Sequence, residues 1–560
     1  MTRRAMDLIG GMSSVVPDTA WTVLIKPNIS IARPSGFRQH LGTGHLGGAG
    51  AVTPAPRLLA DYIWPLVPFP SHLAKGGAMR TRIVALICVL FCITAQAVIA
   101  DGLVPITTSS SEARAAYLRA RDLFENLRNI EARADLQAAL AADPDFALAW
   151  IALAQASTSA QEFFENVERA AELTDKVSPG ERLWIEGFEA GVKGLTDVQL
   201  ERYTELASTH GDDPRVYNLL GTHYFGQQNW PAAIAAFEQA THLVPSYSPP
   251  YNMLGYSRRF AGDIDGAERA FQKYIELIPN HPNPYDSYAE LLMKTGRFEE
   301  SIAAYRQALA QDDHFQASSR GIATNLNMLG RHAEARSELQ RMLPLARNDG
   351  ERRGVWFAMA VSHLDEGFSD AAITAITTEL ALAACIDDAV AMAGDHTNIG
   401  TIHLEEGRTD QAEAHFAAAL AVVEASDRDE RVKDNWRRGD LYNRGRIAAA
   451  RGDLAVAREL ATQLLGQSEA IGNLFGARLA HQLAGIAALT DGDADTALAE
   501  LAQANQQNPA NLLRQAQAAA AVGDDAAAKQ YLHRTVDFNA LNNLNYSLVR
   551  RQAQASLENQ

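Results

Sequence analysis

Residues 217–245 read YNLLGTHYFGQQNWPAAIAAFEQATHLVP, and this stretch decides the fold. Apolar and small residues recur every three or four positions, which is typical of helices that bury one face. A proline near the end predicts where the second helix stops, because proline cannot continue a helix. The stretch therefore predicts two packed helices joined by a turn. Its key positions are Tyr217, Leu220, Gly221, Tyr224, Ala233, Phe237 and Pro245.

The same pattern returns every 34 residues. Small residues recur at Ala233, Ala267, Ser301 and Ala335, and large apolar residues recur at Phe237, Phe271, Tyr305 and Leu339. Glycines follow the same interval at Gly262, Gly296 and Gly330. A fixed period of this length indicates a repeat architecture in which each unit stacks on its neighbours, because one hairpin cannot bury its apolar face alone.

This pattern resembles the tetratricopeptide repeat (TPR) family, whose signature positions are all filled in residues 217–245. The resemblance implies an all-α fold, an α-solenoid wound as a right-handed superhelix of about twelve stacked hairpins with a C-terminal capping helix. In the hairpin that contains Gly255, we expect this glycine to lie against the partner helix, where a side chain would clash. We expect Gly262 to end a helix in the left-handed conformation.

The match to the pattern varies along the chain. Residues 113–213 hold degenerate units, residues 214–349 well-matched units and residues 353–542 irregular units. Residues 543–560 form a polar capping helix and tail. In the irregular part the small residue of the second helix recurs at uneven intervals, which predicts longer helices or inserted loops near 384–395 and 426–439. The recurring residues are Ala372, Ala412, Ala457, Ala497 and Ala528, and the polar residues of the cap are Arg550, Arg551, Gln552 and Gln554.

The first hundred residues differ from the rest. Residues 79–82 are Met-Arg-Thr-Arg, a twelve-residue apolar run follows, and small residues precede Asp101. This order is typical of a secretory signal peptide over 79–100, with the mature chain beginning near Val98 or Asp101. Residues 1–78 are then upstream or disordered sequence. The alternative is a membrane anchor over 83–100, at the short end for a spanning helix.

Charge and cysteine content narrow the function. The chain has a net charge of −17, and the chain without residues 1–100 has a net charge of −23. Such acidity argues against nucleic acid, whose phosphates need clustered Lys and Arg, and favours basic protein partners. Cys385 is the single cysteine after residue 100. It has no partner for an internal disulfide, and we expect it to have a packing role.

No enzyme motif is found. The segments His363-Leu-Asp-Glu and His403-Leu-Glu-Glu lack the second histidine of a zinc-protease helix, and they stand at matching places in two repeats. We expect no catalysis, no cofactor and no metal. The alternative is a helical-toroid enzyme acting on glycans, with its acidic residues among the many carboxylates.

The sequence favours an exported scaffold for protein–protein interaction in the periplasm of a bacterial envelope. The alternatives are a membrane-anchored TPR assembly factor, held only through residues 83–100, and a cytoplasmic regulator. In TPR arrays the first helix of each hairpin lines the binding groove, so the resemblance implies a groove for protein or peptide segments in residues 214–349. The candidate groove residues are Asn218, Thr222, Asn252, Tyr256, Asp286, Glu290, Arg320 and Thr324.

Overall fold

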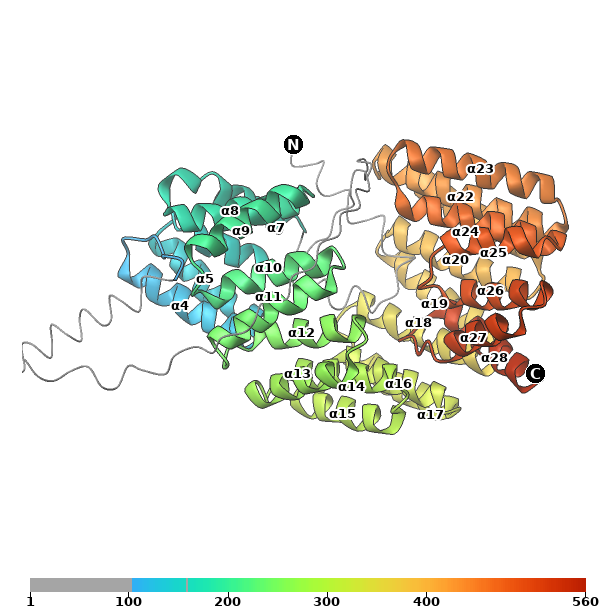
Figure 1. The fold of residues 1–560 in the computed structure, drawn as a ribbon, viewed down its shortest axis with the longest axis horizontal. Coiled ribbons are helices and arrows are strands. Elements are labelled where there is room, and N and C mark those ends of the chain that lie inside the picture. Colours follow the sequence, from blue (N-terminus) through green and yellow to red (C-terminus); the bar gives the residue numbers. More distant parts are fainter. Residues whose placement is uncertain (1–102, 158–159, 560) are drawn as a thin grey trace, which may run out of the picture. The chain divides into compact units, whose positions relative to one another are not determined.

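The computed structural model describes residues 103–157 and 160–559. These residues contain 25 α-helices and no strand, and the helices form twelve hairpins followed by one single helix (Figure 1). The predicted α-solenoid of about twelve hairpins is confirmed. The proposed signal peptide and the sequence before it lie outside the described residues. Within the described ranges, no helix combines the length and the apolar character that a bilayer span needs.

Three hairpins form the degenerate N-terminal part. Although their match to the repeat pattern is weak, each one packs its two helices together and contacts the next. The helices are α4 (Ser111–Glu125) with α5 (Asn129–Ala142), α6 (Ala147–Gln155) with α7 (Ala160–Ala171), and α8 (Pro179–Val192) with α9 (Thr196–Thr209), and a short 3-10 turn (Thr174–Lys176) precedes α8.

Four hairpins form the well-matched middle part. Pro245 and Pro279 each lie two residues beyond the end of a second helix, as the sequence predicts. The helices are α10 (Pro214–Gly226) with α11 (Trp230–Leu243), α12 (Pro249–Phe260) with α13 (Ile264–Leu277), α14 (Pro282–Lys294) with α15 (Phe298–Gln311), and α16 (Gln316–Met328) with α17 (His332–Met342).

Small residues let the two helices of a hairpin approach closely. A Cβ atom at Gly255 would lie 2.6 Å from the ring of Phe271, which is fully buried. The small residues of the second helices, Ala233, Ala267, Ser301 and Ala335, are all fully buried. Gly262 ends α12 with φ +85°, a conformation that residues with a side chain rarely adopt. The expected roles of both glycines are confirmed.

Five hairpins form the irregular C-terminal part, and the longer helices of the first three settle the alternative left open by the sequence. The uneven repeat comes from longer helices, since the connections at 386–388 and 426–429 stay short. The five predicted alanines are all buried. The helices are α18 (Asp349–Glu366) with α19 (Ser369–Cys385), α20 (Ala389–Glu405) with α21 (Thr409–Ala425), α22 (Glu430–Arg451) with α23 (Leu454–Ala470), α24 (Leu474–Asp491) with α25 (Ala494–Gln503), and α26 (Pro509–Ala521) with α27 (Asp525–Val536); a 3-10 turn (Leu343–Leu345) precedes α18.

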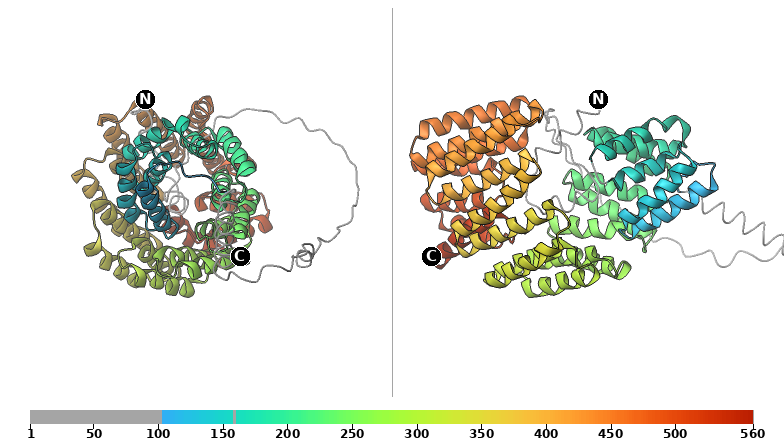
Figure 2. Two further views of the ribbon diagram at one scale, coloured as in Figure 1. Left: turned by 90° about the vertical axis from the view of Figure 1, so that its left-hand side faces the viewer. Right: turned by 180° about the vertical axis from the view of Figure 1, so that it is seen from behind.

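The last helix, α28 (Leu544–Glu558), does more than close the array. It packs against α26 and α27, and it also contacts α18, far away in the sequence (Figures 1 and 2). Arg550 was expected on a polar outer face, but it is buried in an ion pair, with its Nε atom 2.9 Å from Oδ1 of Asp365. Arg551 and Gln552 are exposed as expected.

The loop before α28 also reaches back along the chain. Lys294, at the end of α14, lies 5.4 Å over the ring of Phe538, and Asn539 donates a hydrogen bond to the carbonyl of Lys294 at 3.4 Å. Burial, together with the nearby Arg259, lowers the pKa of Lys294 to about 8. The C-terminal segment therefore contacts α14, α16 and α18 at once, because Arg550 also donates to the carbonyl of Asn327 at 3.2 Å.

Candidate functional site

The eight candidate groove residues form two series on the first helices of the middle hairpins. Each series advances by 34 residues, so its members hold the same place on α10, α12, α14 and α16. The first series is Asn218, Asn252, Asp286 and Arg320, and the second is Thr222, Tyr256, Glu290 and Thr324. The structure divides these residues into a buried group and a partly exposed group.

Tyr256 and Glu290 belong to a buried network between neighbouring hairpins. The Tyr256 hydroxyl donates to Oε2 of Glu290 at 3.1 Å, and Arg259 donates to Oε1 of Glu290 at 2.6 Å. The Arg259 guanidinium also lies 5.0 Å over the Tyr256 ring. Burial, reinforced by the Glu290 carboxylate, raises the pKa of Tyr256 well above its usual value. These two side chains hold α12 against α14 and are not presented to solvent.

Two further candidates are buried as well. Ser318 on α16 donates to Oδ1 of Asp286 at 2.7 Å, which links α14 to α16. The Thr324 hydroxyl donates to the carbonyl of Arg320 at 2.9 Å within its own helix. Asp286 and Thr324 therefore use their polar groups inside the protein.

Four candidates remain partly exposed: Asn218, Thr222, Asn252 and Arg320. The Thr222 hydroxyl donates to the carbonyl of Asn218 at 2.8 Å. The Oδ1 atom of Asn252 is buried and accepts no hydrogen bond within the part of the chain that the structure describes. Because this atom is buried, a partner that binds at Asn252 would have to use the partly exposed remainder of the residue.

Two interactions in this region are not among the sequence predictions: the hydrogen bond between Tyr256 and Glu290, and the ion pair of Arg259 with Glu290. The pairing of Tyr256 with Glu290 has a visible signal, because the two residues are 34 positions apart and neighbouring repeats bring equal positions together. Arg259 has no such signal, because the position 34 residues later is Met293. Its role depends on the rotamer that carries its guanidinium to the next hairpin.

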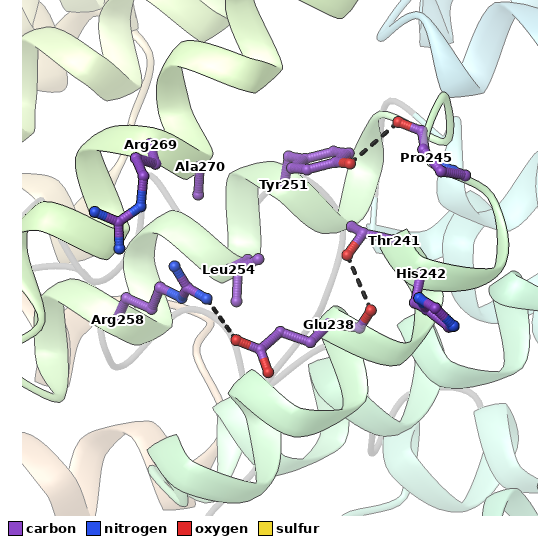
Figure 3. A pocket seen from close by; sticks show the side chains of 9 residues that line it. All are labelled: Glu238, Thr241, His242, Pro245, Tyr251, Leu254, Arg258, Arg269 and Ala270. Atoms are coloured by element: carbon purple, nitrogen blue, oxygen red, sulfur yellow. Dashed lines mark hydrogen bonds and ion pairs between the residues drawn. The ribbon is translucent and has the colours of Figure 1, made fainter. Parts of the chain in front are cut away.

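A shallow pocket of about 530 Å³ lies on the other side of α12, between α11 and α13 (Figure 3). Its polar groups are largely paired with one another: Arg258 with Glu238, and the Tyr251 hydroxyl with the carbonyl of Pro245 at 3.1 Å. None of the eight candidate residues lines this pocket. It is therefore a separate surface from the two series.

Histidines gather at one place in the C-terminal part. Nδ1 of His396 on α20 lies 3.0 Å from Nδ1 of His415 on α21, and the His403 ring lies beside His415. Burial lowers the pKa of all three side chains, which favours neutral imidazoles that can hydrogen bond to each other. In the described ranges, no three His, Cys, Asp or Glu side chains are arranged to hold a metal ion.

His363 and His403 occupy the same place in two hairpins, as the sequence predicts. The carbonyl of each accepts a backbone N–H at 2.8 Å from the residue five positions later, just past the helix end. The expectation for Cys385 was wrong: its side chain is exposed at the end of α19 and takes no part in packing.

Comparison with known proteins agrees with the repeat pattern. Three family models, each described as a tetratricopeptide repeat, match residues 117–176, 200–248, 248–281 and 292–354. These matches include the stretch over 217–245. The comparison with curated proteins found no significant match.

Three of the similar solved structures show a distant likeness. The MamA protein is 18% identical over 30% of this chain and 90% of its own, with a TM-score of 0.28. A tetratricopeptide repeat protein from Parabacteroides merdae is 14% identical over 49% of this chain and 94% of its own, with a TM-score of 0.30. The APC/C hetero-tetramer Cut9–Hcn1 is 14% identical over 80% of this chain and 81% of its own, with a TM-score of 0.36.

At these scores the solved structures say nothing about what this chain binds. The tetratricopeptide repeats are identified by the family matches together with the helical hairpins, and these support a scaffold for protein–protein interaction. The chain contains tetratricopeptide repeats within residues 117–354.

Proposed function

We propose that the chain is an exported scaffold that holds a segment of another protein against α10, α12, α14 and α16. The observation that carries this proposal is a series of partly exposed polar side chains, Asn218, Asn252 and Arg320, at the same place on α10, α12 and α16. Amide and guanidinium groups of this kind can hydrogen bond to the backbone N–H and C=O groups of a partner segment. The buried Tyr256–Arg259–Glu290 network supports the proposal by fixing α12 against α14, which makes the surface rigid before binding.

The acidic scaffold favours a partner segment of opposite, positive charge. A net charge of −23 after residue 100 attracts a basic segment over long range. Salt screens such attraction, so association slows as the salt concentration rises.

The test is a double variant, Asn218→Ala with Asn252→Ala, assayed against the partner captured from envelope extract. We expect binding to weaken at least about tenfold, with an unchanged melting temperature, because both residues are partly exposed and each lies on a first helix. Isothermal titration calorimetry measures the affinity. Tyr256→Ala is unsuitable here, because Tyr256 is buried and its loss would disturb the fold.

The matched control is Gln239→Ala with Gln272→Ala. It removes two amides from α11 and α13, the second helices of the same two hairpins. We expect this control to bind like the unchanged chain. Equal affinity for both double variants would place the partner elsewhere.

Export is the second part of the proposal, and it rests on the sequence of residues 79–100. We expect the protein purified from a bacterial envelope to begin near Val98 or Asp101. N-terminal sequencing and peptide mass mapping measure this directly. Peptides from residues 1–78 in the purified protein would contradict it, and an intact 83–100 segment would favour the membrane anchor.

A further inference from the structure

The segment just before the first helix is bound along three hairpins of the protein's own array. We call residues 104–110 the N-terminal arm. The backbone N–H of Val104 donates to Oδ2 of Asp213 at 3.0 Å, and the backbone N–H of Thr107 donates to Oε1 of Glu181 at 2.7 Å. The hydroxyl of Thr108 bonds Asp143. Asp213 caps the start of α10, Glu181 lies in the first turn of α8, and Asp143 caps the end of α5. The arm therefore runs along one end of these hairpins.

The arm also has an apolar anchor. Val104 is 3% exposed and packs with Leu206 and Val216. Residues of three helices complete this pocket: Leu183 and Trp184 of α8, Ala207 of α9 and Leu219 of α10. Burying a valine side chain contributes about 1.5–3 kcal/mol.

The sequence explains why the arm is extended. Val104 precedes Pro105, and a residue before proline is held in the extended region. Three extended residues span about 10 Å, and helices pack about 8–10 Å apart. The arm makes one such step from Glu181 on the third hairpin to Asp213 on the fourth. The spacing of an extended chain therefore matches the spacing of the repeats.

The carboxylates depend on the arm. Glu181 and Asp213 are both fully buried. Glu181 also accepts from the backbone N–H of Ser178 at 3.1 Å, and Asp213 also pairs with Arg215. Without the arm, each carboxylate would lose a backbone donor, and Glu181 would also lose the hydroxyl of Thr107. The site is therefore complete only with an extended segment in place.

We infer that the starts of α8 and α10, with the pocket around Leu206 and Val216, form a binding site for an extended peptide segment. The site takes a β-branched apolar residue in the pocket and a threonine three positions later. In this structure the chain's own arm fills it. This site goes beyond the proposed function, because none of its side chains is a candidate groove residue. The experiments below test this site alone, so a negative result here would not contradict binding at the groove.

The first test uses the unchanged full chain and amide hydrogen exchange read by NMR or by fragmentation mass spectrometry. We expect the amides of Val104 and Thr107 to exchange at least about 100-fold more slowly than in an unstructured peptide, because both are donated to buried carboxylates. Exchange at the unstructured rate at both amides would overturn the inference, whatever any variant does.

The second test adds a fluorescent peptide with the sequence of residues 103–110 in trans. The tethered arm competes at an effective concentration of about millimolar or more, so the unchanged chain should bind the peptide weakly. Val104→Asp should release the arm from the apolar pocket and bind the peptide at least about 100-fold more tightly. Val104→Ile is the matched control, because it keeps an apolar β-branched side chain, and it should behave like the unchanged chain.

The peptide itself supplies a further control. A peptide with aspartate in place of the valine should not bind to the Val104→Asp protein, because a charged side chain is unfavourable in the apolar pocket around Leu206 and Val216. Equal binding of the peptide by the unchanged chain and by Val104→Asp, or no binding by a Val104→Asp protein with normal helix content, would overturn the inference.

Discussion

Arg550→Ala is expected to lower the stability of the C-terminal hairpins by about 3 kcal/mol. Removing one partner of a buried ion pair typically costs about 3–5 kcal/mol, because the other charge stays buried without compensation. Here the Asp365 side chain is 1% exposed, and Arg550 approaches it from α28. We expect the lower end of the range, because Nε2 of His332 also lies 2.9 Å from Oδ2 of Asp365 and remains as a partner. Urea unfolding followed by circular dichroism measures the change.

Two further variants make this prediction specific to the buried pair. Arg551→Ala removes the adjacent, exposed arginine and should change stability by no more than about 0.5 kcal/mol. Arg550→Ala combined with Asp365→Ala should cost less than the sum of the single variants, because the orphaned charge is gone. Equal effects of Arg550→Ala and Arg551→Ala would show that α28 is not held by Asp365.

Gly255→Leu is expected to destabilise the middle hairpins by about 3 kcal/mol, the upper end of the usual cost of overpacking a core. Even the first added atom would lie 2.6 Å from the Phe271 ring. The ring is fully buried, and it also meets Tyr256 at a centroid distance of 5.1 Å, so it has no room to withdraw. Thermal and urea unfolding of the full chain measure the loss.

Gly466→Leu is the matched control for that change. Gly466 also lies inside a helix, α23, but it is exposed, and a Cβ atom there would meet nothing within 4 Å. Leucine favours helix over glycine, so this variant should be neutral or more stable by up to about 1 kcal/mol. An unchanged unfolding curve for Gly255→Leu would mean that α12 and α13 do not pack as described.

The hairpins were predictable because their information is local. A small residue and a large one return at fixed places, and the buried pairs Gly255–Phe271 and Gly221–Phe237 lie within single hairpins. Even where the interval varies, the alanines from Ala372 to Ala528 are buried, because each second helix must still approach its own first helix. The period therefore reports the fold without any knowledge of distant contacts.

The contacts between distant segments were not predictable in this way. Arg550 meets Asp365 across 185 residues, and Val104 meets Asp213 across 109. Such pairs depend on small rotations that accumulate over several hairpins, and no local pattern records them. This is why Arg550 looked like part of a polar cap, and why the N-terminal arm carried no signal beyond the extended preference of Val-Pro.

The candidate site was only partly predictable for a related reason. The repeat register places all eight residues at two positions of the first helices, but it does not say which side chains find partners inside the protein. Tyr256 and Glu290 pair because their chemistries match at equal positions, whereas Asn218 and Asn252 stay partly exposed. The proposed binding surface is therefore smaller and more amide-rich than the sequence suggests.

The first helices of the middle hairpins are the proposed binding surface for the partner. Hydrogen–deuterium exchange of the full chain with and without its captured partner tests this most directly. We expect slower exchange on binding in α10, α12, α14 and α16, with α11, α13, α15 and α17 unchanged. Slower exchange confined to those second helices, or to the hairpins after residue 349, would contradict it.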